Sequence, residues 1–162
     1  MLPLLNHAAL YEKIAFEKPY TDSANAKTFK TVISVALIPE FTRRTDASGY
    51  GLIHFTLNER LLPANVSLTE DEISRADGLG NTILAGEIEQ DLPAWGAPGN
   101  ARDPALGLKP GPDTMGVSVH SGLTFVGFAD GRVVPISSKI NPSILRAIST
   151  PEGGEPEHEW SK

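Results

Sequence analysis

The chain has 162 residues, of which 40% are hydrophobic and 21% are charged, a balance typical of a folded globular protein rather than a disordered segment. Its formal net charge of −6 argues against nucleic acid as a partner, because binding to phosphates requires a basic surface. Cysteine is absent, which excludes disulfides, thiolate metal ligands and cysteine nucleophiles. No apolar run approaches the roughly 18 residues of a membrane-spanning helix, so the chain as given is expected to be soluble.

The N-terminal third predicts two short helices followed by a strand. The first helix is expected over residues 8–16, with Asn6 as its N-cap. The second is expected over residues 24–31, with Ser23 as its N-cap. The apolar run 32–38 then indicates a buried strand, which a proline ends.

The middle of the chain predicts two strands, a short helix and a long loop. Residues 50–57 and 81–88 have the composition of strands. Between them, Thr69 and Glu72 have the spacing of a capping box, so a helical turn is expected to start there. Residues 91–114 are rich in proline and glycine and show no periodicity, which indicates a loop.

The strongest local signal is a β-hairpin near the C-terminus. Its strands are expected over residues 123–128 and 133–136, which are β-branched, aromatic or apolar. Asp130 and Gly131 lie between them and predict a two-residue turn in which both residues have positive φ.

A last helix is predicted over residues 143–149, with Asn141 as N-cap and Pro142 as its first residue. Helices at the start, strands in the middle and one helix at the end predict an α+β fold with a mostly antiparallel sheet. We expect one globular domain over residues 1–150 and an acidic, flexible tail over 151–162.

His120 and Asp130 are the first candidates for chemistry, with nine residues between them. They could form a charge-assisted pair or share a metal. A metal site needs further ligands, and no other histidine lies at a metal-motif spacing from His120. The favoured interpretation is structural: Asp130 serves the turn, and His120 bonds to the backbone beside the hairpin or to Asp130.

Glu87 ends the strand expected after the glycine turn at 78–80, and it could be a general base or a metal ligand. The sequence places no second carboxylate with it, so a structural role at the strand end is favoured. A hydrolase or metalloenzyme using His120, Asp130 and Glu87 ranks last. Clustering of the three around a pocket would support it, and their dispersal would argue against it.

Trp95 is a candidate ligand contact, because it lies in the loop 91–114 that is rich in proline and glycine. An exposed aromatic residue in such a loop can bind a carbohydrate or a peptide. It can equally anchor the loop on the core, and the core role is slightly favoured.

Several segments together resemble a planctomycete-type pseudopilin-like family of unknown function. That family is known for a His, nine residues, Asp-Gly signature and for a segment of the form SNTI-x-x-GE. The match runs in order over nearly the whole chain. The matching segments are 2–7 with 10–11, 19–20 with 24–26, 77–87, 120–131, and 140–147 with 153–154. The chain departs from the family at 36–40, where members often have Cys-Pro-Ser-Asp, and at Gly80, where they usually have Ser.

The resemblance implies a non-enzymatic structural subunit of a pilus or a type II secretion pseudopilus at the cell envelope. Family members usually begin with a prepilin leader and a long apolar helix, which would anchor the full-length protein in the membrane, with its head in the periplasm or at the cell surface. By this resemblance, the sequence is expected to start roughly where the globular head of the family begins. The expected partners are copies of itself or related pseudopilin subunits. No cofactor or metal is expected. The motif residues expected to act structurally are His120, Asp130, Gly131, Asn81, Thr82, Gly86 and Glu87.

Overall fold

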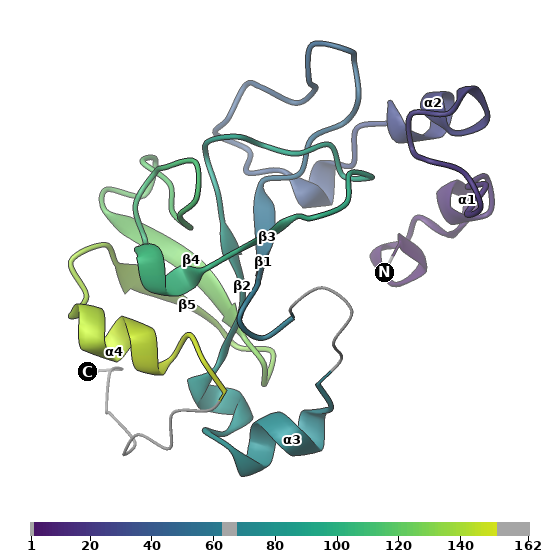
Figure 1. Cartoon of the computed structure of the whole chain (residues 1–162). Coiled ribbons are helices and arrows are strands. Elements are labelled where there is room, and N and C mark those ends of the chain that lie inside the picture. Colours follow the sequence, from purple (N-terminus) through teal and green to yellow (C-terminus); the bar gives the residue numbers. More distant parts are fainter. Residues whose placement is uncertain (1, 63–67, 152–162) are drawn as a thin grey trace. The chain divides into compact units, whose positions relative to one another are not determined.

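The computed structural model describes residues 2–62 and 68–151. The chain divides into two compact units: unit 1 comprises residues 1–54 and 92–98, and unit 2 comprises residues 55–91 and 99–162. Short helices at the N-terminus, a mostly antiparallel sheet and a C-terminal helix confirm the predicted α+β class (Figure 1). None of the helices in the described part of the chain has the length and apolar character needed to cross a membrane. Apart from Pro151, the expected acidic tail lies outside the described residues.

Unit 1 consists of short helical segments around a small apolar core. Its elements are the 3-10 helices η1 (Leu2–Leu5) and η2 (Ser34–Ala36) and the α-helices α1 (Ala8–Tyr11) and α2 (Ser23–Phe29). The core combines the end of α2 and the segment that follows it with residues from further along the chain: its buried apolar residues are Phe29, Ile33, Ala36, Leu37, Ile38, Leu52, Leu92 and Ala94.

The helix predicted over 8–16 is much shorter than expected, because α1 ends at Tyr11. Asn6 is not its N-cap: Asn6 has φ 62°, and the N-cap position is occupied by His7 without a side-chain hydrogen bond. The reason lies in Asn25 of α2, whose Oδ1 accepts a hydrogen bond from the Ala15 amide. A side chain that takes up backbone groups in this way competes with the helical hydrogen bonds.

The second helix begins one residue earlier than predicted. Asp22, rather than Ser23, is the N-cap of α2, and its carboxylate accepts a hydrogen bond from the Ala24 amide at 2.9 Å. Both residue types are good N-caps, so the sequence alone did not distinguish them.

The strand predicted over 32–38 is wrong. The segment is buried as expected at Ile33 and Ile38, but it contains the short helix η2. Apart from local turns around η2, its backbone bonds to His54 instead of a neighbouring strand: the Ile38 amide donates to Nδ1 of His54 at 3.0 Å, and the His54 amide donates to the Ala36 carbonyl at 2.9 Å. The sequence therefore predicted correctly that this apolar run is buried. It predicted wrongly that the backbone of the run bonds to a neighbouring strand.

Unit 2 is built around a five-stranded sheet with the order β3-β1-β2-β4-β5. Only the β1–β3 pair is parallel. The strands are β1 (Phe55–Asn58), β2 (Ile83–Glu87), β3 (Ala101–Arg102), β4 (Leu123–Phe128) and β5 (Val133–Ser137). The helices are α3 (Glu70–Arg75), α4 (Pro142–Ala147) and the 3-10 segments η3 (Leu79–Asn81) and η4 (Pro104–Leu106).

The helix starts predicted for unit 2 are confirmed. Thr69 and Glu72 form the complete capping box of α3, with each side chain bonded to the backbone amide of the other. Asn141 caps α4 by accepting a hydrogen bond from the Ser143 amide, and Pro142 is the first residue of the helix. These signals act within one turn of the chain, so they do not depend on the rest of the fold.

The core of unit 2 lies on one face of the sheet, which we call the inner face, and α4 packs against it (Figure 1). Asn58 of β1 fixes this arrangement, because its fully buried amide donates hydrogen bonds to the carbonyls of Ile83 and Ser149. The core cluster consists of Ile83, Leu108, Met115, Val126, Phe128, Ile136, Leu145 and Ile148.

The predicted hairpin is present, but its turn has three residues instead of two. The Gly131 amide donates to the carbonyl of Phe128, and the Phe128 amide donates to the carbonyl of Arg132. Gly131 has φ 86° as expected, whereas Asp130 is not among the residues with positive φ. A three-residue hairpin loop needs a left-handed residue only at its last position, which is where Gly131 lies.

Arg102 organises the long loop predicted over 91–114, which also contains β3 and η4. Its buried guanidinium donates to the carbonyls of Gly111 and Thr114 at 2.8 Å each, and to the carbonyls of Gln90 and Asp91. Burial lowers the pKa of Arg102 from its ordinary value, although a guanidinium stays charged at neutral pH. One buried cation thus replaces the periodic hydrogen bonding that the loop lacks.

His54 makes the stability of the protein depend on pH. Burial lowers its pKa below the ordinary value of 6.5. The hydrogen bond to the Arg43 carbonyl opposes part of this shift, and the charges of Arg44 and Arg43 add to it. The unfolded chain therefore takes up a proton that the folded state resists, so stability is complete above about pH 6.5 and falls as the pH drops. Urea unfolding should show a loss of up to about 1 kcal/mol between pH 6.5 and pH 5.5.

The matched controls for this prediction are His54→Gln and His7→Gln. His54→Gln should flatten the pH dependence over this window, because Gln does not titrate. His7→Gln should retain it. An unchanged pH slope in His54→Gln would show that another group is responsible.

Gly131→Val should lower the free energy of unfolding by about 1–3 kcal/mol, because a β-branched residue is strained at positive φ. Added atoms alone would not cause this loss, since a Cβ at Gly131 meets nothing within 4 Å. Gly127→Val is the matched control, because Gly127 also has open space but lies within β4 without positive φ. Urea unfolding of both variants measures the difference, and equal losses would refute the role of φ.

Candidate functional site

Glu87 is the most constrained carboxylate of unit 2. Glu87 is only 5% exposed, and each of its two carboxylate oxygens has a hydrogen-bonding partner. Oε2 accepts a hydrogen bond from the Phe125 amide of β4 at 2.8 Å, and Oε1 lies 3.1 Å from Nε2 of His120. Its backbone carbonyl accepts from the Gly116 amide at 2.7 Å. One residue at the end of β2 therefore joins β4 and the segment that leads into it.

His120 is held against this carboxylate by two contacts. Because an ionised carboxylate only accepts hydrogen bonds, Nε2 of His120 is the donor to Glu87. The imidazole also packs edge-to-face on the ring of Phe125, with 5.1 Å between the ring centroids. Its side chain is 21% exposed, so the imidazole is only partly shielded from solvent. The partner of His120 is thus Glu87, and neither the backbone nor Asp130 as expected from the sequence.

Asp130 lies at the opposite end of β4, in the hairpin loop. Its carboxylate accepts from both the backbone amide and Nε of Arg132, and these hydrogen bonds lower its pKa from the ordinary value. Arg132 in turn donates to the carbonyl of Gly80 at 2.6 Å. The Asp130 amide donates to the carbonyl of Leu79, so the hairpin loop is bonded to η3.

The two motif segments, 78–87 and 120–131, therefore meet at both of their ends. β2 and β4 run antiparallel between these ends. The His120 ring packs on Phe125 of β4, whereas Asp130 follows the end of β4 in the hairpin loop. The structure brings Glu87 and His120 together and leaves Asp130 apart. The three side chains accordingly do not converge on one reacting atom.

The remaining motif residues have contacts within the same segment. Asn81 donates to the carbonyl of Asp77 at 2.9 Å, and the Thr82 hydroxyl donates to the carbonyl of Gly78 at 3.1 Å. At Gly86, a Cβ would lie only 2.7 Å from Sδ of Met115, so glycine lets this core residue pack against the strand.

The geometry gives no metal centre in the part of the chain that the structure describes. Among these residues, no group of three or more His, Asp or Glu side chains could hold a metal ion. Asp103, another buried carboxylate, is paired with Nε of Arg60 at 2.6 Å. Burial raises the pKa of Asp103, but the hydrogen bonds from Arg60 and from the Ala105 amide, together with the charges of Arg60 and Arg146, outweigh this effect, and the net shift is downward.

The face of the sheet opposite the core, which we call the outer face, is apolar where β4 and β5 form it. Register places Leu123 opposite Ser137, Phe125 opposite Pro135, and Gly127 opposite Val133. Their side chains alternate with those that point into the core. Leu123 is 40% exposed, Phe125 38% and Val133 67%. The sequence predicted the two strands, but it did not reveal that the apolar side chains on this face of the hairpin are exposed in the described part of the chain.

Trp95 belongs to unit 1 and anchors its segment. Its ring lies on that of Phe29, with 4.3 Å between centroids, and its Nε1 donates to the carbonyl of Thr31 at 2.9 Å. The loop 91–114, suggested as one ligand-binding surface, is divided between the units: residues 92–98 belong to unit 1 and the others to unit 2.

Known proteins give no further assignment. Comparisons with protein-family models, curated proteins and solved structures find no match to this chain. The assignment of a function therefore rests on the geometry described above and on the resemblance of the sequence motifs.

Removing Glu87 should destabilise unit 2 more than removing any exposed carboxylate. Glu87→Ala leaves the partly buried Phe125 amide without its acceptor and should cost about 2–3 kcal/mol, and His120→Ala should cost about 1–2 kcal/mol. The double variant should cost less than the sum, with a coupling of about 1 kcal/mol. Urea unfolding of the four proteins measures this coupling.

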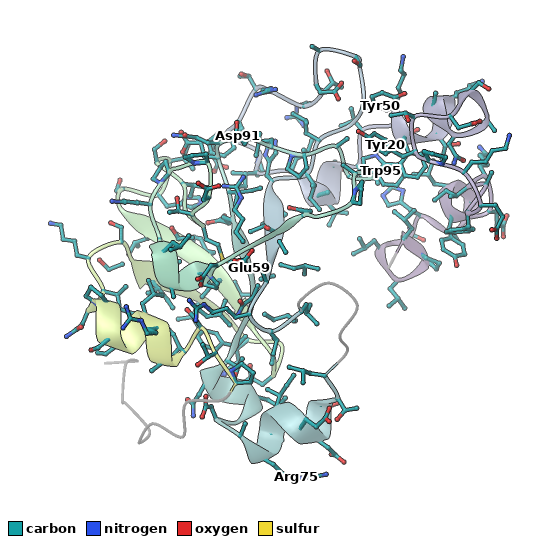
Figure 2. All side chains as sticks on the ribbon, viewed as in Figure 1. Tyr20, Tyr50, Glu59, Arg75, Asp91 and Trp95 are labelled. Atoms are coloured by element: carbon teal, nitrogen blue, oxygen red, sulfur yellow. The ribbon has the colours of Figure 1, made fainter. Side chains whose placement is uncertain are left out.

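Glu59→Ala is the control for this cycle, because Glu59, which is labelled in Figure 2, is an exposed residue, and it should change stability by no more than about 0.5 kcal/mol. Strict additivity of Glu87→Ala and His120→Ala would contradict the proposed contact.

Proposed function

We propose that this chain is the globular head of a pseudopilin-like subunit, a non-enzymatic structural protein that assembles into a pilus or a secretion pseudopilus at the cell envelope. The resemblance of its motifs suggests the class. The observation that carries the proposal is the apolar outer face of β4 and β5. A subunit of this kind acts by packing against other subunits, so it needs such a surface.

The outer face differs from the scattered exposed apolar residues of an ordinary surface. Leu123, Phe125, Val133 and Pro135 are exposed on two adjacent strands and share one side of the sheet. Contiguous apolar surface of this kind marks sites of protein interaction. In the pilin class, the head packs on the C-terminal half of the long apolar helix, and a sheet face of this composition suits such a contact.

The positions of the motif residues support a structural role. Glu87 and His120 join β2 and β4 at one end, and Asp130, Arg132 and Gly80 join the same region at the other. A structural role, fixing the register of two strands, is enough to explain these residues. Catalysis would instead require groups that converge on a substrate.

The edge of the sheet favours packing through the face over addition of a strand. Phe125 of β4 lies opposite Pro135 of β5, but its amide donates to the Glu87 side chain of β2. That amide therefore forms no hydrogen bond with β5. Pro135 also has no amide hydrogen to offer to another strand. Proline on an edge strand is a known device against edge-to-edge pairing.

The alternative is a binding module that takes a carbohydrate or a peptide on the loop 91–114. Within unit 2, this loop is held from inside, because Arg102 occupies the carbonyls of Gly111, Thr114, Gln90 and Asp91. Those carbonyls are directed to the guanidinium and not to a ligand. The structural subunit is therefore the better-supported proposal.

Sedimentation equilibrium of the purified chain tests the proposal. We expect reversible self-association with a Kd between about 1 µM and 1 mM, the range of weak interfaces. Leu123→Asp combined with Val133→Asp should raise the Kd at least about tenfold, because each places a charge in the apolar contact.

Leu106→Asp is the matched control, since Leu106 is 57% exposed in η4, which packs next to α4 and is not part of the outer face of β4 and β5. It should leave the Kd unchanged. A parent protein that stays monomeric up to about 1 mM, or an equal effect of Leu106→Asp, would overturn the assignment of the outer face as the assembly surface.

A further inference from the structure

Unit 1 contains an apolar pocket that the proposed function does not use. Its volume is about 590 Å³, within the range of roughly 300–1,000 Å³ typical of small-molecule sites. Tyr20 and Trp95, both labelled in Figure 2, contribute to its wall. Other aromatic residues around it are Tyr11, Phe16 and Phe29, and the aliphatic lining includes Leu2, Leu5, Ile14, Ile33, Ala36 and Ile53.

One wall of the pocket is held by a buried amide. Asn25 is fully buried, and its side chain accepts from the Ala15 amide and donates to the carbonyls of Ala15, Lys18 and Pro19. These bonds fix the segment 15–20, which supplies Phe16, Lys18, Pro19 and Tyr20 to the lining. Unlike an open apolar face, this wall is therefore formed before any ligand arrives.

The facing wall is equally well defined. Trp95 is fixed by its hydrogen bond to Thr31 and by its stacking on Phe29. Phe29 in turn meets Tyr20 in an edge-to-face contact with 5.9 Å between centroids. Because Nε1 of Trp95 is already bonded, this wall presents an apolar ring surface to a ligand.

Lys18 is the only charged residue among those that line the pocket, all of which belong to the described part of unit 1. Its Nζ lies 3.6 Å from Oδ1 of Asp22, and its side chain is 53% exposed. This distance is longer than a hydrogen bond, and the same Oδ1 also accepts from the Ala24 amide. An ammonium has three donors, so Lys18 can bind a further carboxylate.

We infer that this pocket binds a free aliphatic monocarboxylate, a fatty acid of medium chain length, with its chain among the aromatic rings and its carboxylate at Lys18. The apolar lining selects the chain, and the single cation selects an anionic head over a neutral or cationic one. This inference is independent of the proposed assembly function, because its residues lie in unit 1 and the outer face lies in unit 2.

Decanoate, decanol and decyltrimethylammonium are suitable probes, because they share one chain and differ in the charge of the head. The chain has two tryptophans, so Trp160→Phe leaves Trp95 as the only one. Calorimetry should show saturable binding of decanoate. The affinity should decrease in the order decanoate, decanol, decyltrimethylammonium. A decanoate brominated on its chain should quench Trp95, since bromine quenches an indole only in contact.

Lys18→Gln should weaken decanoate binding about 5-fold, the effect of an exposed ion pair, and should leave decanol binding unchanged. Lys27→Gln is the matched control, because Lys27 is an exposed lysine of α2 outside this lining, and it should have no effect. Ala36→Leu adds volume to the wall and should weaken both ligands, with circular dichroism confirming the fold.

Absence of saturable decanoate binding would overturn the inference. Equal binding of decanoate and decanol, or equal effects of Lys18→Gln and Lys27→Gln, would overturn the assignment of Lys18. Binding without quenching of Trp95 by the brominated ligand would place the site elsewhere and overturn the assignment of this pocket.

Discussion

The burial of the Glu87 carboxylate is the constraint on which the sheet of unit 2 depends. A buried carboxylate is costly unless its oxygens are bonded, and here the partners are the Phe125 amide and His120. Both partners come from a part of the chain more than thirty residues away. Satisfying this one charge therefore aligns β4 with β2 and brings the segment before β4 alongside. The alignment directs Phe125 and its neighbours on β5 to the outer face, which is the surface proposed for assembly.

The same physical principle appears in places where the chain lacks regular structure. Asn25 holds the segment 15–20 of unit 1, and Arg102 holds the loop 91–114 on the side of unit 2. His54 serves the segment around Ile38. In each case one buried polar side chain takes up several backbone groups that would otherwise need a helix or a strand. In unit 1, Asn25 explains in this way how an irregular segment can still form a defined wall of the pocket.

The candidate site was only partly predictable. The segments 78–87 and 120–131 stand out in the sequence, and the structure shows that they contact one another at both ends. The sequence suggested the wrong partner for His120, because Asp130 is nearer along the chain than Glu87 is. Pairing across strands depends on register, and register is set by distant residues. Arg132, Asn25 and Arg102 have no local pattern that marks their roles, since each acts through contacts that only the folded chain provides.

The sequence by itself determined the features that are decided within a few residues: the capping box at Thr69, the cap at Asn141, the positive φ of Gly131 and the strands of the hairpin. In these cases the responsible atoms are neighbours along the chain, so composition and spacing suffice. Tertiary structure decided where α1 ends, why the run 32–38 is not a strand, and which face of the sheet stays uncovered. Those outcomes depend on Asn25, His54 and the packing of α4, because a buried backbone group bonds to whichever partner the fold brings to it, whatever its local propensity.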